Sequence, residues 1–143
     1  MNKTVLLVED DPHDIFFMKR AMDMAGLSEQ LRIVEDGQAA VDYLSGQGEW
    51  SDRERYPLPS LVLLDLKLPQ MGGLEVLAWI RQQRDLAGIM VVVLTSSQLP
   101  EDIESAYRLG ANSYLAKPTN GTELPRIIGR IKEYWLELNT FLP

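Results

Sequence analysis

The chain of 143 residues contains no cysteine and a single histidine, His13. It therefore cannot form a disulfide, a zinc ribbon or a thiolate nucleophile, and one histidine cannot pair with another to bind zinc. At this length, folding buries roughly two-thirds of the surface that an unfolded chain exposes, so a core forms without cross-links. We expect residues 1–143 to make one domain without zinc or thiol chemistry.

Basic side chains and long apolar runs are also scarce. Lysine and arginine number 14 against 21 acidic residues, and the net charge of −7 argues against a nucleic-acid partner. The first apolar run, Val5 to Val8, is too short for a signal-peptide core, and no later run approaches a membrane span. The expected location is the cytoplasm, with no membrane or nucleic-acid partner.

Short apolar runs alternate with segments of helical spacing. The runs predict five strands: Thr4–Val8, Leu31–Val34, Ser60–Leu64, Ile89–Leu94 and Ser113–Ala116. Apolar residues three and four apart predict helices after them, over 12–25, Gln38–Leu44, around Leu74–Ile80, around Ile103–Tyr107, and from Leu124 to Trp135. Strands that are apolar throughout and alternate with helices indicate a parallel sheet covered on both faces. The fold class is therefore α/β, doubly wound.

Several details refine this outline. Asp11 is placed to cap the first helix with Pro12 at its first position. The methionines Met18, Met22 and Met24 are interpreted as core filler. Residues 46–60 are polar and charged, so we expect an exposed loop inserted into a core of about 4–138, with a short tail over 139–143. No output domain is expected.

Polar residues stand where four of the expected strands end. Glu9 and Asp10 follow the first strand and Asp65 the third, while Thr95 and Lys117 follow the fourth and fifth. Side chains beyond the carboxyl ends of parallel strands converge on a crevice at the point where the strand order reverses. One edge of the sheet is therefore expected to collect three carboxylates, a hydroxyl and an ammonium group.

Three carboxylates in one place repel each other unless a cation lies between them. Mg²⁺ suits this set because it binds a few carboxylate oxygens, keeps several waters and leaves room for a phosphate oxygen. The charges −3, +2 from the metal and +1 from Lys117 sum to zero, so the site can accept an anion. Carboxylates attack phosphoryl donors to give aspartyl phosphates. We assign Asp65 as nucleophile, Asp10 and Asp65 as metal ligands, and Glu9 as a ligand through water.

Each residue has a simpler explanation when it is taken alone. The acidic run before the first helix suits a helix N-terminus, which is how we interpret Asp11. Thr95 could cap the next helix, Lys117 could be a surface charge and Asp65 a turn residue. The probability that all four simpler explanations hold at one edge of one sheet is roughly one in ten. The combination therefore favours a phosphoryl site, with Lys117 and Thr95 binding phosphoryl oxygens.

The segments VLLVEDDP, LVLLDLKLPQMGGLEVL, VVVLTSS and SYLAKP, in this order and spacing, resemble the receiver domain of two-component response regulators, which are CheY-like. The resemblance spans residues 4–138. It implies a flavodoxin-like sheet of order 2-1-3-4-5 with five helices, phosphorylation of Asp65 by a histidine kinase, and a cis bond before Pro118. It also implies a Mg²⁺ held by Asp10, Asp65 and the main-chain carbonyl of Lys67.

The resemblance further implies a switch pair and a pathway. Thr95 would turn toward the phosphoryl group while the ring of Tyr114 moves inward, which alters the face of helix four, strand five and helix five. The insertion, AYRLGANSYLAKP and the pair Tyr134–Trp135 resemble single-domain regulators that partner phytochrome-type kinases. Apolar side chains near the chain end suit a homodimer or a contact with the protein's own core: Tyr134, Trp135, Leu138 and Phe141.

The leading hypothesis is a stand-alone switch that signals by protein–protein contact, not an enzyme with an external substrate. It would catalyse only its own aspartyl phosphorylation and dephosphorylation. One alternative is an aspartyl-phosphate hydrolase of the haloacid-dehalogenase type, but Lys67 stands where that family's second acid is needed. Another alternative, a receiver used as a scaffold without phosphorylation, is disfavoured by the intact acidic set, Thr95 and Lys117.

Overall fold

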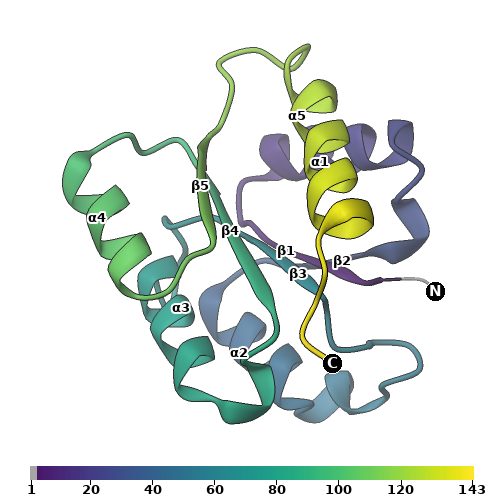
Figure 1. Cartoon of the computed structure of the whole chain (residues 1–143), viewed down its shortest axis with the longest axis vertical. Coiled ribbons are helices and arrows are strands. Elements are labelled where there is room, and N and C mark those ends of the chain that lie inside the picture. The colour runs from purple at the N-terminus through teal and green to yellow at the C-terminus, as the bar shows by residue number, and fades with distance from the viewer. Residues whose placement is uncertain (1–2) are drawn as a thin grey trace.

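The computed structural model describes residues 3–143 and contains a five-stranded parallel sheet of order β2-β1-β3-β4-β5 (Figure 1). The strands are β1 (Val5–Val8), β2 (Leu31–Val34), β3 (Leu61–Leu64), β4 (Met90–Thr95) and β5 (Ser113–Ala116). Their boundaries agree with the expected strands to within one residue. The predicted class, the doubly wound order and the five helices are confirmed.

Helices cover both faces of the sheet. They are α1 (Pro12–Met24), α2 (Gly37–Ser45), α3 (Gly73–Gln82), α4 (Pro100–Arg108) and α5 (Leu124–Ile131), with short 3₁₀ turns Ser28–Gln30, Gly48–Ser51 and Arg84–Leu86. α1 and α5 lie side by side on one face (Figure 1), and the core residues of α2, α3 and α4 pack against the other. After α5 the chain continues as a π-helical segment, Lys132–Leu138, so the regular helix ends before Trp135. None of the described helices is long and apolar enough to cross a bilayer.

The first helix shows how local sequence sets an element boundary. The Asp11 carboxylate accepts hydrogen bonds from the backbone N–H groups of His13 at 2.8 Å and Asp14 at 3.3 Å. It therefore satisfies two N–H groups that have no partner within the helix, and these hydrogen bonds hold the pKa of Asp11 below its ordinary value. Asp11 is the predicted N-cap, and His13 is exposed.

The structure differs from expectation at Met24. Met18 and Met22 are buried, but Met24 is 66% exposed. Because consecutive residues of a helix are 100° apart, Met24 lies about 240° around α1 from Met18 and faces solvent. The prediction of core filler is therefore wrong for Met24.

Residues 46–60 are less exposed than the polar composition suggests. Trp50 and Tyr56 stack against the buried ring of Tyr43, with ring centroids 5.2 and 6.0 Å from it. Arg53 donates hydrogen bonds to the carbonyl oxygens of Tyr43 at 2.8 Å and Leu44 at 3.0 Å, near the C-terminal end of α2. We call this group, Tyr43, Trp50, Arg53 and Tyr56, the aromatic cap. The aromatic residues of the insertion thus find apolar partners, which a count of charges and prolines does not reveal.

Candidate functional site

The strand register brings the strand-end residues together. Val8 pairs with Leu64, so Glu9 and Asp65 follow matched positions on adjacent strands, and the backbone N–H of Asp65 donates to the Val8 carbonyl at 3.1 Å. Thr95 pairs with Ala116 in the same way, and the residue that follows is Lys117. Parallel strands end at one edge, so the side chains of these positions converge there.

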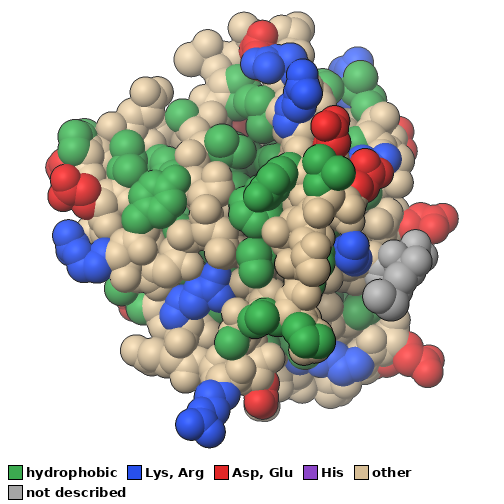
Figure 2. All heavy atoms as spheres, viewed as in Figure 1, with side chains coloured by type: hydrophobic (Ala, Val, Ile, Leu, Met, Phe, Trp, Pro, Cys, Tyr) green, Lys and Arg blue, Asp and Glu red, His purple; other side chains and the backbone are tan. Residues whose placement is uncertain are grey.

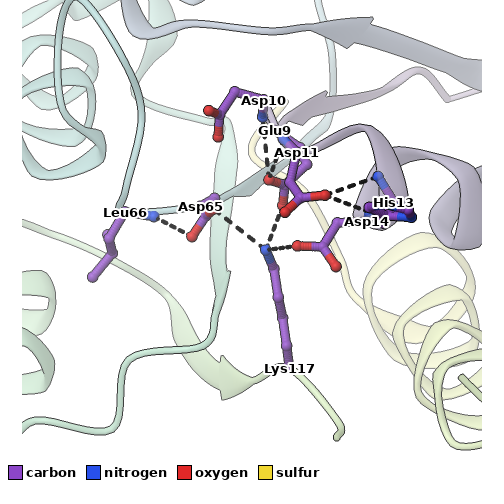
Figure 3. A network of polar contacts seen from close by, with 8 residues as sticks. All are labelled: Glu9, Asp10, Asp11, His13, Asp14, Asp65, Leu66 and Lys117. Carbon is purple, nitrogen blue, oxygen red and sulfur yellow. Dashed lines mark hydrogen bonds and ion pairs between the residues drawn. The ribbon is translucent and has the colours of Figure 1, made fainter. Parts of the chain in front are cut away.

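Three carboxylates form the acidic part of the site, as Figure 3 shows. One carboxylate oxygen from each of Glu9, Asp10 and Asp65 lies within 4.8 Å of the others. Glu9 and Asp65 are buried, and Asp10 is partly exposed. The Glu9 Oε1 atom accepts the backbone N–H groups of Asp10 and Asp11, both at 3.1 Å. The fold thus fixes the orientation of Glu9 from the backbone.

The ammonium group of Lys117 contacts Glu9 and Asp65 of this set and a further acid, Asp14. Its Nζ lies 2.6 Å from Glu9 Oε2, 2.7 Å from Asp14 Oδ2 and 3.3 Å from Asp65 Oδ2 (Figure 3). The contact with Asp14 was not predicted from the sequence. Asp14 lies in the first turn of α1, directly after the Asp11 cap. Because that turn begins beside the end of β1, the sequence did indicate that Asp14 lies near the site.

Burial and pairing act in opposite directions on the two most buried charges. Burial raises the pKa of Glu9 to about 7, while the hydrogen bond from Lys117 opposes this rise and the charge of Asp65 adds to it. Burial by itself lowers the pKa of Lys117, but hydrogen bonds to Asp14 and Glu9 and the nearby Asp65 charge outweigh burial and raise that pKa. The lysine therefore stays cationic at neutral pH.

Thr95 is fully buried, and its Oγ1 has no hydrogen-bond partner among the residues that the structure describes. A buried hydroxyl without a partner is unfavourable, so its presence calls for an explanation outside packing. Tyr114 is half-buried, and its hydroxyl donates to the Ser97 carbonyl oxygen at 2.9 Å. The two expected switch residues therefore adjoin the same loop, which follows β4.

Comparison with known proteins identifies this arrangement. A family model described as the response regulator receiver domain matches residues 5–129. The chain belongs to this receiver family. The resemblance that the sequence motifs carry is thereby confirmed, and the family acts in signalling.

Relatives of this receiver include regulators of different pathways. The response regulator Rcp1 of a Synechocystis strain is 41% identical over 138 residues, covering 96% of this chain and 92% of the relative. A probable methanogenesis regulatory protein, FilR2 of Methanothrix harundinacea, is also 41% identical over 138 residues, covering 94% and 84%. The phosphorylated cyanobacterial phytochrome response regulator RcpA has a TM-score of 0.91 at 37% identity, with both chains covered completely.

A divalent metal fits the acidic part of this receiver. Three carboxylates face only one ammonium group, which leaves their negative charge in excess, and their oxygens are close enough to share one ion. Oxygen ligands of this kind suit Mg²⁺ and its relatives. A solved structure of Rcp1, which superposes with a TM-score of 0.87 at 40% identity and 99% coverage of both chains, is described as its Mn²⁺-bound form.

The loop after Asp65 packs closely against the carboxyl edge of the sheet, where the acidic residues and Lys117 meet. The Asp65 Oδ1 atom accepts the Leu66 N–H at 2.8 Å, and a Cβ atom on Gly73 would lie 2.2 Å from the Asp65 carbonyl oxygen. Only glycine allows this approach, which returns the chain to the start of α3. The Lys67 side chain is exposed, and metal binding by its carbonyl stays a prediction.

One implication of the resemblance is wrong in this structure. The peptide bond before Pro118 was expected to be cis, but residues 3–143 contain no cis peptide bond. The trans form is favoured by about 0.5–1 kcal/mol at proline. Lys117 contacts Glu9, Asp14 and Asp65 with this bond in the trans form.

Proposed function

We propose that this receiver accepts a phosphoryl group on Asp65 from the phosphohistidine of a histidine kinase, in a Mg²⁺-dependent reaction, and signals by protein–protein contact. The observation that carries the proposal is a buried carboxylate beside Lys117 together with a buried Thr95 hydroxyl that has no partner within the part of the chain that the structure describes. An ammonium group and a free hydroxyl at the same edge supply the hydrogen-bond donors that an incoming phosphoryl group needs.

The transfer is a displacement at phosphorus. An Asp65 carboxylate oxygen forms a bond to phosphorus while the phosphorus–nitrogen bond of phosphohistidine breaks. The imidazole nitrogen keeps the electron pair and takes a proton from solvent. Lys117 and Thr95 donate hydrogen bonds to the phosphoryl oxygens, because both lie at the edge where Asp65 ends its strand. Glu9, Asp10, Asp65 and the Lys67 carbonyl would hold Mg²⁺, which supplies positive charge to the same oxygens.

The conformational switch depends on the Thr95 hydroxyl, one of these hydrogen-bond donors. A phosphoryl group on Asp65 gives the Thr95 hydroxyl the partner it lacks, which favours the conformation in which Thr95 faces that group. Tyr114 contacts the adjoining loop through Ser97, so a shift of that loop changes the position of its ring. We expect phosphorylation to alter the surface of α4, β5 and α5.

Two surfaces suit the partners of this reaction. Phe16 and Phe17 of α1 are 60% and 41% exposed, and Phe17 lines the cavity next to Lys117, so apolar surface for the kinase adjoins the phosphoacceptor. Figure 2 shows hydrophobic side chains gathered over α4, β5 and α5. In the segment after α5, Tyr134 and Leu138 are 54% and 67% exposed, whereas Trp135 packs against the core. This face suits a downstream protein or a homodimer.

The proposed donor is a phytochrome-type histidine kinase. The support is the likeness to RcpA, which is described as a phytochrome response regulator. Phosphotransfer from purified autophosphorylated kinases tests the pathway: a phytochrome-type kinase should label this receiver fastest. Faster transfer from a kinase of another class would contradict the pathway while leaving the phosphoacceptor role intact.

The phosphoacceptor role is tested with acetyl phosphate and Mg²⁺. Mass spectrometry should show one added phosphoryl group on the wild-type chain and none on Asp65→Asn, which keeps the size of the side chain but not its nucleophilic charge. Asp85→Asn, on an exposed turn away from the site, is the matched control and should be labelled like wild type. Labelling of Asp65→Asn, or none of wild type, would overturn the proposal.

A further inference from the structure

All three hydrogen-bond donors of the Lys117 ammonium group have carboxylate partners. The two short contacts, 2.6 and 2.7 Å, go to Glu9 and Asp14, and the longest, 3.3 Å, goes to Asp65. An ammonium group has three N–H donors and no more. A phosphoryl group on Asp65 can therefore gain a short hydrogen bond from Lys117 only if one of the present contacts loosens.

The three carboxylates differ in how firmly they are held. The Glu9 side chain is 2% exposed and accepts two backbone N–H groups besides Lys117, and Asp65 is 8% exposed. The Asp14 side chain is 39% exposed, so water can replace its contact with the lysine. Asp14 also lies in the first turn of α1, where the helix N-terminus stabilises a negative charge without any lysine. Asp14 is thus the partner that Lys117 can leave most easily.

We propose that Asp14 is a positioning residue that competes with the phosphoryl group for Lys117. The inference rests on the proposed phosphoacceptor function and deepens it. In the resting receiver, Asp14 draws the ammonium group away from Asp65, and the incoming group must displace this contact. Lys117 and Asp14 both line a cavity of about 160 Å³, which leaves space for the side chains to move apart. The strength of the Asp14 contact then sets how readily the site takes up an anion.

The competition predicts a gain of affinity when Asp14 loses its charge. Asp14→Asn should bind beryllofluoride with Mg²⁺ about three- to fivefold more tightly than wild type, the range expected for a partly exposed ion pair. The acetyl phosphate concentration that gives half-maximal labelling should fall by the same factor, with little change in the maximal rate. Fluorine NMR titration and labelling kinetics measure the two quantities.

The matched control is Asp11→Asn. It removes the same formal charge three residues earlier, and asparagine keeps the N-cap hydrogen bonds that Asp11 makes. Its effect on both quantities should be well below that of Asp14→Asn. Added salt should shrink the difference between wild type and Asp14→Asn, because the contact is accessible to counter-ions.

The outcomes separate this proposal from the one on which it rests. If wild type binds beryllofluoride and is labelled, but Asp14→Asn has unchanged or weaker affinity, the competition is disproved and the phosphoacceptor function stands. If Asp14→Asn lowers the unfolding midpoint but leaves beryllofluoride affinity unchanged, the Asp14–Lys117 ion pair only stabilises the packing of α1 against the loop after β5. If wild type neither binds beryllofluoride nor is labelled, the phosphoacceptor function itself fails.

Discussion

The two ends of the sheet differ in how well their polar groups are paired. At the carboxyl end, Glu9, Asp10 and Asp65 place like charges close together near one lysine, and the Thr95 hydroxyl is buried with no partner in the described part of the chain. At the amino end, the aromatic cap stacks three rings, and Arg53 satisfies helix carbonyls. Charge repulsion and the missing hydrogen bond at the carboxyl end make folding less favourable. The ring contacts and the Arg53 hydrogen bonds at the amino end make folding more favourable. Stability and chemistry are therefore separated along the strands.

The largest loss of stability is expected at the aromatic cap. Trp50→Ala removes a ring that packs on both Tyr43 and Tyr56, and it should lower the free energy of unfolding by about 3 kcal/mol. The folded fraction should still be labelled at Asp65. Urea denaturation and mass spectrometry measure the two effects, with Glu49→Ala, an exposed neighbour, as control. Loss of labelling in the folded protein would show that the two ends are coupled.

A change in the free energy of unfolding of similar size is expected from Mg²⁺, which should bind only at the carboxyl end of the sheet. Mg²⁺ at a hundred times its dissociation constant should raise the free energy of unfolding by about 2.7 kcal/mol. Asp10→Asn should lose most of this gain, yet without metal it should be about 1 kcal/mol more stable than wild type because one repelling charge is gone. Thermal unfolding with Mg²⁺ and with chelator tests both signs. A variant that is less stable without metal would argue against the repulsion.

A smaller loss is expected from one hydrogen bond of the aromatic cap. The hydroxyl of the fully buried Tyr43 donates to the Pro57 carbonyl oxygen at 2.8 Å. Tyr43→Phe should therefore lower the free energy of unfolding by about 1 kcal/mol and leave beryllofluoride affinity unchanged. The unfolding curve should keep its slope, since the packing of the ring is retained.

The smallest change in stability is expected at Thr95. Thr95→Val removes a buried hydroxyl that has no partner within residues 3–143, so stability should be unchanged or higher by less than about 1 kcal/mol. Beryllofluoride should bind roughly tenfold more weakly, because a hydrogen bond to a charged ligand is lost. A clear loss of stability would mean that the hydroxyl contributes to the resting fold.

Much of the fold could be predicted because its signals are local. Apolar strands, the Asp11 cap and glycines at turns act within a few residues, and all the strands lie where the sequence placed them. The two exceptions have different causes. Met24 is exposed because of its angle on α1, and the insertion is ordered because its rings meet Tyr43 of α2. Neither relation is visible in composition.

The order of residues in the chain is enough to show which chemical groups stand at the strand ends, since residues after parallel strands must share an edge. How those groups pair depends on the folded arrangement. The register sets Glu9 beside Asp65, and the start of α1 brings Asp14 to within 2.7 Å of Lys117, 103 residues away. The packing also leaves the Thr95 hydroxyl without a hydrogen-bond partner among residues 3–143. Hydrogen bonds and ion pairs depend on distances of a few ångströms, and only the packing of helices on the sheet sets distances that finely.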